Sequence, residues 1–488
     1  MDLSSSELYF YALALGFHFS LSFYLASVLQ IVSYKPKRLL FHFPKRHWHL
    51  YYFFFPLIGF VISAATKLLL LALVVFILHL ASLVFWYYKM DKKLVTSPRI
   101  KRLGFILLLC GPLFGLAHAF VISQPHVLDS LLFCFALSYL IEHFINKGYL
   151  RKAAKKLKLH SELKIIMITA SYGKTSMKYM LAHFLQDSKT HFAKGSVNTL
   201  LGVAKDINNN LPIDAQFYVV EAGAREVGDV KELCELLKPQ YVIVGEVGSA
   251  HLEYFKSREA ILKEKLEALN SPRLTYAMLH GSSCFNLHAL KHTPPFTLMP
   301  DYDDLAKGIS ATLEGLSFFL GKNEQIYHSK LLGAFNAQNI AAAYYMAKFL
   351  GVKKERLDAL VPSLEAVEHR LKVLQREPKF IIDDGFNGNL SGMSSSYLLC
   401  QNYKKGKRVL VSPGILEAST QDNVLLCEQI NECFDLVILT ASSNASVFSQ
   451  CINIDFLLVS KDELLEVLEQ QTGPGDLVLF SNDAPSFY

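Results

Sequence analysis

Long apolar runs dominate the first third of the chain. Four of them approach or exceed the roughly 20 residues that an α-helix needs to cross a bilayer, and a fifth is shorter but carries a cluster of aromatic residues typical of the membrane interface. The four runs occupy residues 9–32, 68–88, 103–123 and 127–145, and the fifth occupies residues 50–66. This pattern predicts an N-terminal α-helical transmembrane bundle of about five spans.

Charge is distributed unevenly and predicts the orientation of these helices. Residues 1–158 contain 18 Lys and Arg against 5 Asp and Glu, although the net charge of the whole chain is only +6. The basic residues gather in the loops 34–49 and 89–102 and in the segment 147–158. Because positive segments stay on the cytoplasmic side, five spans place the N-terminus outside and everything after residue 158 in the cytoplasm. The positive charge therefore belongs to membrane-flanking loops and does not indicate nucleic-acid binding.

From residue 163 onward the pattern changes. Short apolar runs, each long enough for one buried strand, alternate with segments of helical spacing, which predicts parallel α/β sheets. The expected strands are 164–168, 216–221, 241–245, 380–383, 408–411, 436–440 and 477–480. The eight Cys are scattered without metal-ligand spacing, which predicts reduced thiols in a cytosolic compartment.

The first of these strands leads into a candidate phosphate loop. It ends in small residues and a Gly-Lys-Thr at 173–175, and residues 177–186 follow with helical spacing. In such a strand-loop-helix, backbone N–H groups and the helix N-terminus attract phosphate oxygens, the lysine reaches the outer phosphates, and the threonine hydroxyl ligates Mg²⁺. Ile168 stands where the general pattern has its first glycine, so an ordinary turn between strand and helix is the alternative.

The eight residues 169–176, with the sequence TASYGKTS, resemble the ATP-binding loop of the Mur ligase family, with Ala170 in place of the usual glycine. The resemblance implies that this loop binds ATP and that its lysine is catalytic. It assigns nucleotide contacts to Ser171, Tyr172, Gly173, Lys174, Thr175 and Ser176.

Three downstream positions resemble the family's Mg²⁺ ligands. Glu221 ends an apolar strand like the family's E-x-G segment, and His251 lies in a stretch similar to the family's second metal-binding motif. On a charged helix, Lys265 aligns with the lysine that is carbamylated in the family, and Lys263 competes with it. Together with Thr175, these residues are implied to hold Mg²⁺, and His251 and Lys265 to be catalytic. Judged alone, Glu221 would be a solvated strand end and His251 a structural loop histidine.

Two further segments are implied to contact the nucleotide. Residues 332–343 resemble the family's asparagine signature, in which Asn336 and Asn339 lie three apart on one helix face and could offer amides to adenine. A pair of capping asparagines is the alternative. Arg370 resembles the family's hinge arginine and is implied to act in catalysis by binding the γ-phosphate, with His369 where the family has glycine.

Two segments are implied to contact the other substrates. Asn198 and Thr199 resemble the loop that meets the muramyl substrate. Residues 381–389 resemble the segment of the family members that add D-alanyl-D-alanine. There, Asp384 is implied to contact the nucleotide, and Asn387 and Asn389 to shape the dipeptide side.

The resemblance covers about residues 160–488 and implies a multidomain fold. After the transmembrane helical region, 1–158, we expect an α/β P-loop central ATPase domain, 159–372, and a C-terminal Rossmann-like α/β domain, 373–488. The small domain with which the family grips UDP is missing, and the membrane helices stand in its place.

The implied activity is that of an ATP- and Mg²⁺-dependent amide ligase of peptidoglycan synthesis. It would join D-alanyl-D-alanine to UDP-N-acetylmuramoyl-tripeptide through an acyl phosphate, at the inner (cytoplasmic) membrane, as a multi-pass protein with its catalytic domains in the cytoplasm. The lipid bilayer and other cell-wall synthesis proteins are the further expected partners, and nucleic acid is not. Two alternatives are a Mur-type ligase with a different acceptor, and a membrane transporter or scaffold with a degenerate nucleotide fold.

Overall fold

The structure is a computed structural model of the 488-residue chain. It describes residues 5–32, 34–35, 39, 47–90, 93–122, 127–248, 252–284, 296–322, 325–386, 388–415, 420–441 and 444–483. The chain divides into two compact units, Met1–Gly148 and Tyr149–Tyr488, which are described separately below. The three predicted domain boundaries stay a prediction.

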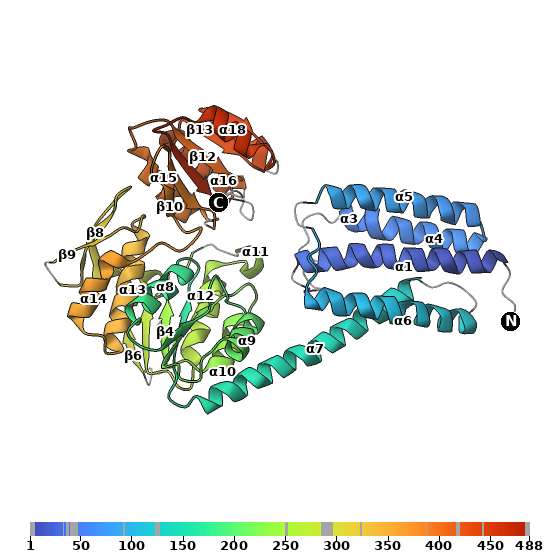
Figure 1. The fold of residues 1–488 in the computed structure, drawn as a ribbon, viewed down its shortest axis with the longest axis horizontal. Helices are drawn as coiled ribbons and strands as arrows, with labels where there is room; N and C mark the ends of the chain where they lie inside the picture. The colour runs from blue at the N-terminus through green and yellow to red at the C-terminus, as the bar shows by residue number, and fades with distance from the viewer. Residues whose placement is uncertain are drawn as a thin grey trace. The chain divides into compact units, whose positions relative to one another are not determined.

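The N-terminal unit is helical (Figure 1). Its elements are α1 (Ser5–Ile31), α3 (His47–His49), a π-helical turn (Leu50–Phe54), α4 (Phe55–Thr66), α5 (Leu69–Tyr88), α6 (Pro98–Ile122) and the first part of α7 (Val127–Leu159). Among the described residues, four helical stretches have the length and composition to cross a membrane, namely Tyr9–Ile31, His47–Thr66, Leu69–Tyr88 and Val127–Leu159. These stretches agree with the predicted apolar character, while the count of five spans stays a prediction.

Some buried polar groups of this unit are paired, whereas buried side-chain atoms of His18, Ser22, His79 and Trp86 have no hydrogen-bond partner among the described residues. Tyr24 is fully buried and its hydroxyl lies 2.7 Å from Nδ1 of His49. The guanidinium of Arg102 donates two hydrogen bonds to the buried carboxylate of Glu142, at 2.6 and 2.9 Å. Because this geometry neutralises Glu142 within the unit, it supports a structural role for that carboxylate rather than a transport pathway.

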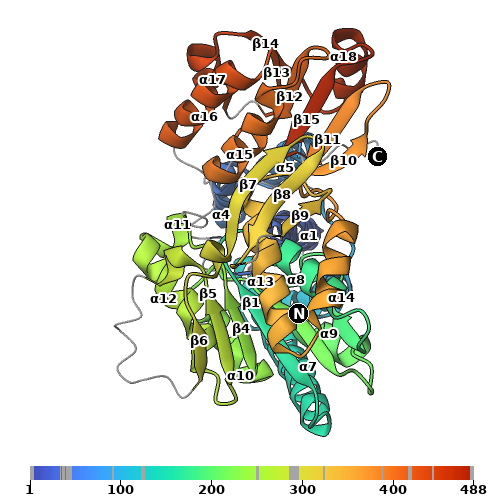
Figure 2. The same cartoon turned by 90° about the vertical axis from the view of Figure 1, so that its left-hand side faces the viewer.

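A six-stranded parallel sheet forms the centre of the second unit. Its order is β2-β3-β1-β4-β5-β6, and β4, β5 and β6 can be followed side by side in Figure 2. The strands are β1 (Lys164–Thr169), β2 (Thr190–Phe192), β3 (Phe217–Ala222), β4 (Tyr241–Val244), β5 (Tyr276–Leu279) and β6 (Thr297–Met299). Strand β1 lies between β3 and β4, so the chain leaves β1 at the point where the strand order reverses, which is where open α/β sheets bind ligands.

Helices cover both faces of this sheet because successive side chains of each strand alternate between two apolar cores. One core includes Ile166 and Ile168 of β1 together with α8 (Lys174–Phe184) and α13 (Phe335–Phe349). The other includes Ile165 and Met167 together with residues of three helices, α9 (Leu200–Asn209), α10 (Asp229–Leu237) and α12 (Arg258–Leu266). Ala153 of α7 is fully buried in this second core, with Leu150 and Leu157 packed against it.

An antiparallel meander follows that the apolar pattern did not predict. It consists of β7 (Ala306–Thr312), β8 (Gly315–Leu320) and β9 (Ile326–Ser329), and it contributes Phe318 and Tyr327 to the core beneath α13. Figure 2 shows β7 and β8 side by side. After α13, α14 (Lys354–Leu360) leads toward the second sheet of this unit.

The last part of the chain forms a second six-stranded sheet, of order β10-β11-β15-β12-β13-β14. Its strands are β10 (Lys372–Gln375), β11 (Phe380–Asp384), β12 (Arg408–Ser412), β13 (Leu436–Leu439), β14 (Asp455–Leu458) and β15 (Leu477–Ser481). Only β10 is antiparallel to its neighbour. Its helices are α15 (Leu390–Gln401), α16 (Thr420–Cys433), α17 (Ala445–Cys451) and α18 (Leu464–Gln471). The prediction of strands alternating with helices in parallel sheets is confirmed for all seven expected strands.

Candidate active site

The candidate phosphate loop connects β1 to α8. Gly173 directly precedes the helix with a φ of 74°, which is left-handed and favours glycine. A Cβ atom at this position would lie 2.7 Å from Oδ1 of Asn339. Glycine is therefore required here for two reasons, the backbone conformation and the close approach of α13.

Lys174 begins α8, and its ammonium lies over its own loop. Nζ donates hydrogen bonds to the carbonyl oxygens of Ala170 at 2.6 Å and Ser171 at 3.1 Å. Burial lowers the pKa of Lys174 to about 8, with Glu221 opposing the shift and Arg370 adding to it. The Glu221 carboxylate and the Arg370 guanidinium thus lie within electrostatic reach of the loop. The positive charges of Lys174 and Arg370 suit the binding of a polyphosphate.

Glu221 lies on β3, in the register position next to Ile168 of β1, and is almost completely buried. Its Oε2 accepts a hydrogen bond from the Thr175 hydroxyl at 3.1 Å. Its Oε1 lies 2.8 Å from Nζ of Lys178 in an ion pair, but among the described residues no donor is aligned to make a hydrogen bond to this oxygen. A buried carboxylate oxygen with open lone pairs, next to a threonine hydroxyl, fits the oxygen-ligand preference of Mg²⁺.

The described residues do not form a complete metal cage. Among them, no group of three or more His, Cys, Asp and Glu side chains could hold an ion. Residue 251, the predicted histidine ligand, lies outside the described residues. A cation at Thr175 and Glu221 would therefore take further ligands from phosphate oxygens and water, as Mg²⁺ commonly does.

The two lysines that compete for carbamylation differ sharply in their surroundings. Lys263 is exposed, whereas Lys265 is almost completely buried. Burial lowers the pKa of Lys265 to about 7, and the positive charge of Lys174 contributes to the shift, while Glu264 and Asp229 oppose it. Burial and the electrostatic interaction with Lys174 of the phosphate loop favour Lys265 for the predicted role, which stays a prediction.

The predicted hinge has a distinctive backbone. His369 has a φ of 59°, a left-handed conformation that suits the glycine found there in the family, and Leu371 has a φ of 51°. Nδ1 of His369 lies 2.6 Å from Oδ2 of Asp383. Between the two left-handed residues, Arg370 donates to the carbonyl oxygen of Phe386 at 2.5 Å. Two left-handed residues in a row of three hold the guanidinium in a specific direction.

Electrostatics place Arg370 near the phosphate loop. Burial lowers its pKa, while Asp384 and Glu221 oppose the shift. Asp384 itself is buried, accepting from the Leu371 amide at 3.1 Å and from the Ser396 hydroxyl at 2.6 Å. These two hydrogen bonds connect Asp384 to Leu371 of the predicted hinge and to Ser396 of α15. Its predicted contact with the nucleotide stays a prediction.

The two asparagines of α13 contact each other. Nδ2 of Asn339 donates to Oδ1 of Asn336 at 3.1 Å, and Nδ2 of Asn336 donates to the carbonyl of Leu332 at 2.8 Å. Both side chains are buried, and Asn339 lies against Gly173. This pair therefore lies at the phosphate loop, and its predicted contact with adenine stays a prediction.

Of the predicted substrate residues that the structure describes, Asn198 lies next to the end of strand β3, and Thr199 and Asn389 cap helices. Asn198 lies against Gly223, where a Cβ would meet its side chain at 2.8 Å, and its carbonyl accepts from the Gly223 amide at 2.9 Å. Thr199 caps α9 by accepting from Gly202, and Asn389 caps α15 by accepting from Gly392 at 2.8 Å. These two caps fulfil ordinary structural roles. Residue 387, the other predicted dipeptide contact, lies outside the described residues.

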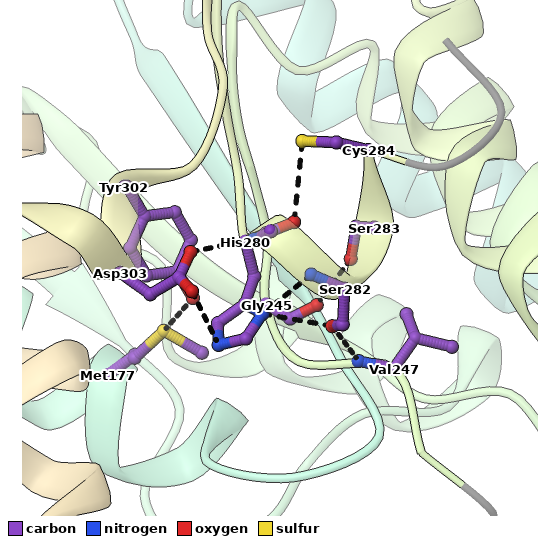
Figure 3. A network of polar contacts seen from close by, with 10 residues as sticks. Met177, Gly245, Val247, His280, Ser282, Ser283, Cys284, Tyr302 and Asp303 are labelled. Atoms are coloured by element: carbon purple, nitrogen blue, oxygen red, sulfur yellow. Dashed lines mark hydrogen bonds and ion pairs between the residues drawn. The ribbon is translucent and has the colours of Figure 1, made fainter.

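A polar network holds the segment that leads toward residue 251 (Figure 3). Nδ1 of His280 lies 2.9 Å from Oγ of Ser282, and Nε2 lies 3.6 Å from the carboxylate of Asp303. The Ser282 hydroxyl accepts from the Val247 amide at 3.0 Å, and Ser283 donates to the Gly245 carbonyl at 2.8 Å. The network thus ties the end of β5 to the segment after β4.

That segment also contacts the phosphate loop directly. The Ser171 amide donates to the carbonyl of Glu246 at 2.7 Å. The ring of Tyr172 lies over Gly248, where a Cβ would be only 2.4 Å away. Glu221 and Asn339 thus contact the phosphate loop, and Lys265 and Arg370 lie within electrostatic reach of Lys174. The roles assigned to these residues stay predictions.

One residue of this cluster was not predicted. Lys178 is fully buried and contacts the candidate metal ligand Glu221. A signal was available, because Lys178 follows Lys174 by four residues on the predicted helix and therefore lies on the same helix face. A second lysine on the face that meets the sheet requires a buried partner.

Comparison with known proteins supports this arrangement. Residues 168–347 match the family model of the Mur ligase middle domain. The chain is 23% identical over 346 residues to the UDP-N-acetylmuramoyl-tripeptide--D-alanyl-D-alanine ligase of Bacillus subtilis, an alignment that covers 68% of this chain and 75% of the relative. The enzyme of that name from Borreliella burgdorferi is 26% identical over 293 residues, which cover 57% of this chain and 62%, under two thirds, of the relative.

A solved structure shows the same fold. The MurF ligase of Thermotoga maritima, crystallised in complex with ADP, superposes with a TM-score of 0.59 at 22% identity, covering 70% of this chain and 81% of that one. Residues 168–347 of this chain are therefore similar in sequence to the Mur ligase middle domain, and the second unit shares the fold of the MurF ligase.

Proposed function

We propose that this chain is an ATP-dependent ligase that joins D-alanyl-D-alanine to UDP-N-acetylmuramoyl-tripeptide and releases ADP and phosphate. The observation that carries the proposal is the 3.1 Å contact between the Thr175 hydroxyl of the phosphate loop and the buried carboxylate of Glu221 on the neighbouring strand. The names of the similar proteins support the acceptor and the nucleotide-linked substrate.

The reaction would proceed in two displacements. The tripeptide carboxylate attacks the γ-phosphorus of ATP, the bond to ADP breaks, and an acyl phosphate forms. The dipeptide amine then attacks the acyl carbon, phosphate leaves, and the amine loses a proton to solvent. Lys174 and Arg370 supply two positive charges where negative charge accumulates, so most of the catalysis is positioning and charge stabilisation.

Thr175 and Glu221 would hold a Mg²⁺ ion, which when bound would neutralise phosphate charge. Asn339 limits the space around Gly173 and so keeps the loop amides directed at the phosphates. Arg370, held between two left-handed residues, would approach the same phosphates from the hinge.

Lys265 fits the role of the carbamylated lysine. Carbamylation joins a neutral amine to carbon dioxide and releases one proton, which leaves a carboxylate in place of the ammonium. Because the pKa of Lys265 is lowered to about 7, a large share of this amine is neutral at physiological pH. Conversion also removes the repulsion between two neighbouring cations, Lys265 and Lys174.

We further propose that the helical N-terminal unit anchors the enzyme in the inner membrane, with the second unit in the cytoplasm. The four long apolar helices support the anchor, and the positive charges of residues 147–158 support the orientation. The bilayer and cell-wall synthesis proteins located there would be the partners of this unit. An anchored enzyme would release its product close to membrane-bound steps.

The decisive experiment is an amino-acceptor assay on the full-length protein in detergent micelles or nanodiscs. ADP release is measured with ATP, Mg²⁺, UDP-N-acetylmuramoyl-tripeptide and, in separate reactions, D-alanyl-D-alanine, D-glutamate or meso-diaminopimelate. We expect release with the dipeptide only. Release with another acceptor would assign a different Mur-type activity, and no release with any acceptor would favour a scaffold with a degenerate nucleotide fold. Lys174→Ala is the matched inactive control and should leave membrane insertion unchanged.

A further inference from the structure

We infer that Lys178 is a positioning residue that couples the proposed metal ligand Glu221 to the segment 193–199, which carries the predicted muramyl-substrate residues. The inference rests on the proposed function and assigns a role to a residue outside the expected nucleotide, metal and substrate contacts. It makes one buried ammonium responsible for the geometry of two neighbouring binding sites.

Lys178 is placed where an ammonium is costly unless it is well paired. Its side chain is 0% exposed, one helical turn after Lys174 on α8. Nζ donates to the carbonyl oxygens of Ala193 at 2.6 Å and Gly195 at 2.5 Å. Nζ also forms an ion pair at 2.8 Å with Oε1 of Glu221 and lies 5.0 Å from the centroid of the Tyr179 ring. Two carbonyl oxygens and one carboxylate therefore offset the cost of burying this side chain.

The contact with Glu221 fixes the direction of that carboxylate. Lys178 attracts Oε1 from one side while Thr175 donates to Oε2 from the other. The carboxylate is therefore held between helix α8 and strand β3 and cannot rotate without losing one of these contacts. Groups that orient a metal ligand in this way change metal affinity even though they do not touch the metal.

The contacts with the two carbonyls fix the start of the segment 193–199. Gly195 is in the left-handed conformation, and its amide donates to the Tyr179 hydroxyl at 2.9 Å. The Ser196 hydroxyl lies 3.5 Å from the Thr175 hydroxyl, and Asn198 then reaches Gly223. The segment thus runs from Lys178 past the metal-binding threonine to the strand end that follows Glu221. Movement of Lys178 would displace both ends of this path.

A merely structural lysine would have a different signature. If Lys178 only stabilised the fold, its removal would lower the folded fraction and the maximal rate, but the protein that still folds would bind its substrates normally. If Lys178 positions both sites, folded variants that lack it should require higher concentrations of Mg²⁺ and of the UDP-linked substrate. The KM for the dipeptide should change little.

The test compares Lys178→Met and Lys178→Gln with the wild type in full-length protein, using initial ligation rates and, without turnover, calorimetric titration of Mg²⁺ into the ADP-bound protein. Weaker Mg²⁺ binding in both variants is expected from the titration. Both variants remove the charge, and the glutamine keeps an amide donor for the carbonyls. We expect the Mg²⁺ concentration for half-maximal rate and the KM for UDP-N-acetylmuramoyl-tripeptide to rise about tenfold or more, with the KM for D-alanyl-D-alanine within about twofold. Lys189→Met is the matched control, because Lys189 is exposed and pairs only with the exposed Asp214.

Tyr179→Phe tests the effect on the segment 193–199 separately from the effect on Glu221. It releases the Gly195 amide without altering Glu221, so the KM for the UDP-linked substrate should rise while the Mg²⁺ requirement stays at the wild-type value. This variant keeps the helix and its apolar ring, so it tests the inference even if both Lys178 variants fail to fold.

Unchanged Mg²⁺ and UDP-substrate requirements in folded Lys178→Met or Lys178→Gln, or an unchanged UDP-substrate KM in Tyr179→Phe, would overturn the inference while the wild type still ligates. A wild type that releases no ADP with any acceptor would instead refute the proposed function.

Discussion

The hydroxyl of Thr175 donates a 3.1 Å hydrogen bond to Oε2 of Glu221, which joins the first turn of the phosphate-loop helix to the neighbouring strand β3. These residues are separated by 46 positions in the chain. They meet because β1 and β3 are parallel neighbours whose carboxyl ends lie at the same edge of the sheet.

We predict that Glu221→Gln reduces the ligation rate about 100-fold or more, because the amide keeps the shape of the side chain but cannot supply a negative oxygen to a cation. Thr175→Val should raise the Mg²⁺ requirement, since it removes the hydroxyl but keeps the volume. Rates measured against Mg²⁺ concentration test both changes. Thr275→Val, which removes an exposed hydroxyl bonded to the Gln240 carbonyl, is the control and should behave like the wild type.

A second prediction concerns Lys265 and pH. Because the pKa of Lys265 is lowered to about 7, the neutral amine that reacts with carbon dioxide becomes predominant as the pH rises through this value. The carbamate signal from ¹³C-bicarbonate, measured by NMR, should therefore increase from pH 6 to pH 8 and disappear in Lys265→Ala. Lys263→Ala should retain it, because that side chain is exposed. A signal that persists in Lys265→Ala would transfer the role to another lysine.

A third prediction concerns the phosphate-loop glycine. Gly173→Ala should cost about 1–2 kcal/mol for the left-handed backbone alone, and its methyl group would also collide with Asn339. The free energy of ADP binding should decrease by more than the free energy of unfolding. Gly351→Ala serves as control, since Gly351 is also left-handed, with a φ of 101°, but has open space around it. Thermal unfolding with and without ADP measures both quantities, and equal effects of the two substitutions would argue against the collision.

A fourth prediction concerns membrane topology. Lys67 ends α4 in a turn, and Lys93 follows α5. From the charge distribution, a cysteine introduced at position 67 should react with an impermeant maleimide from outside the cell, whereas one at position 93 should react only after the membrane is opened. The comparison requires a background without other reactive thiols. The reverse labelling pattern would invert the orientation and place the second unit outside the cytoplasm.

Local patterns were sufficient to predict the parallel strands and the phosphate loop. An apolar run such as 164–168 must be buried on both faces, and a Gly-Lys-Thr after it leaves little choice of conformation. Lys265 and Arg370 were assigned from resemblance, and both roles stay predictions. The structure shows that Lys265 is buried and that Arg370 lies between two left-handed residues, His369 and Leu371.

Other features depend on contacts between distant segments and could not be predicted. The strands β7 to β9 alternate buried and exposed residues, a pattern that is weak next to the continuous apolar runs. The pairing of Lys178 with Glu221 requires the strand order, which the sequence does not state. Thr199 and Asn389 match a substrate motif, yet their visible role is helix capping, because both requirements select the same short polar side chains.

Helix α7 continues without interruption from Val127 to Leu159, and its last turns supply Ala153 to an apolar core of the second unit. A fragment beginning at residue 160 would lack Ala153 and would expose apolar residues of this core, so we expect it to be prone to aggregate whatever its catalytic residues. A fragment that begins at residue 149 retains the last turns of α7, including Ala153, and is the truncated protein to express.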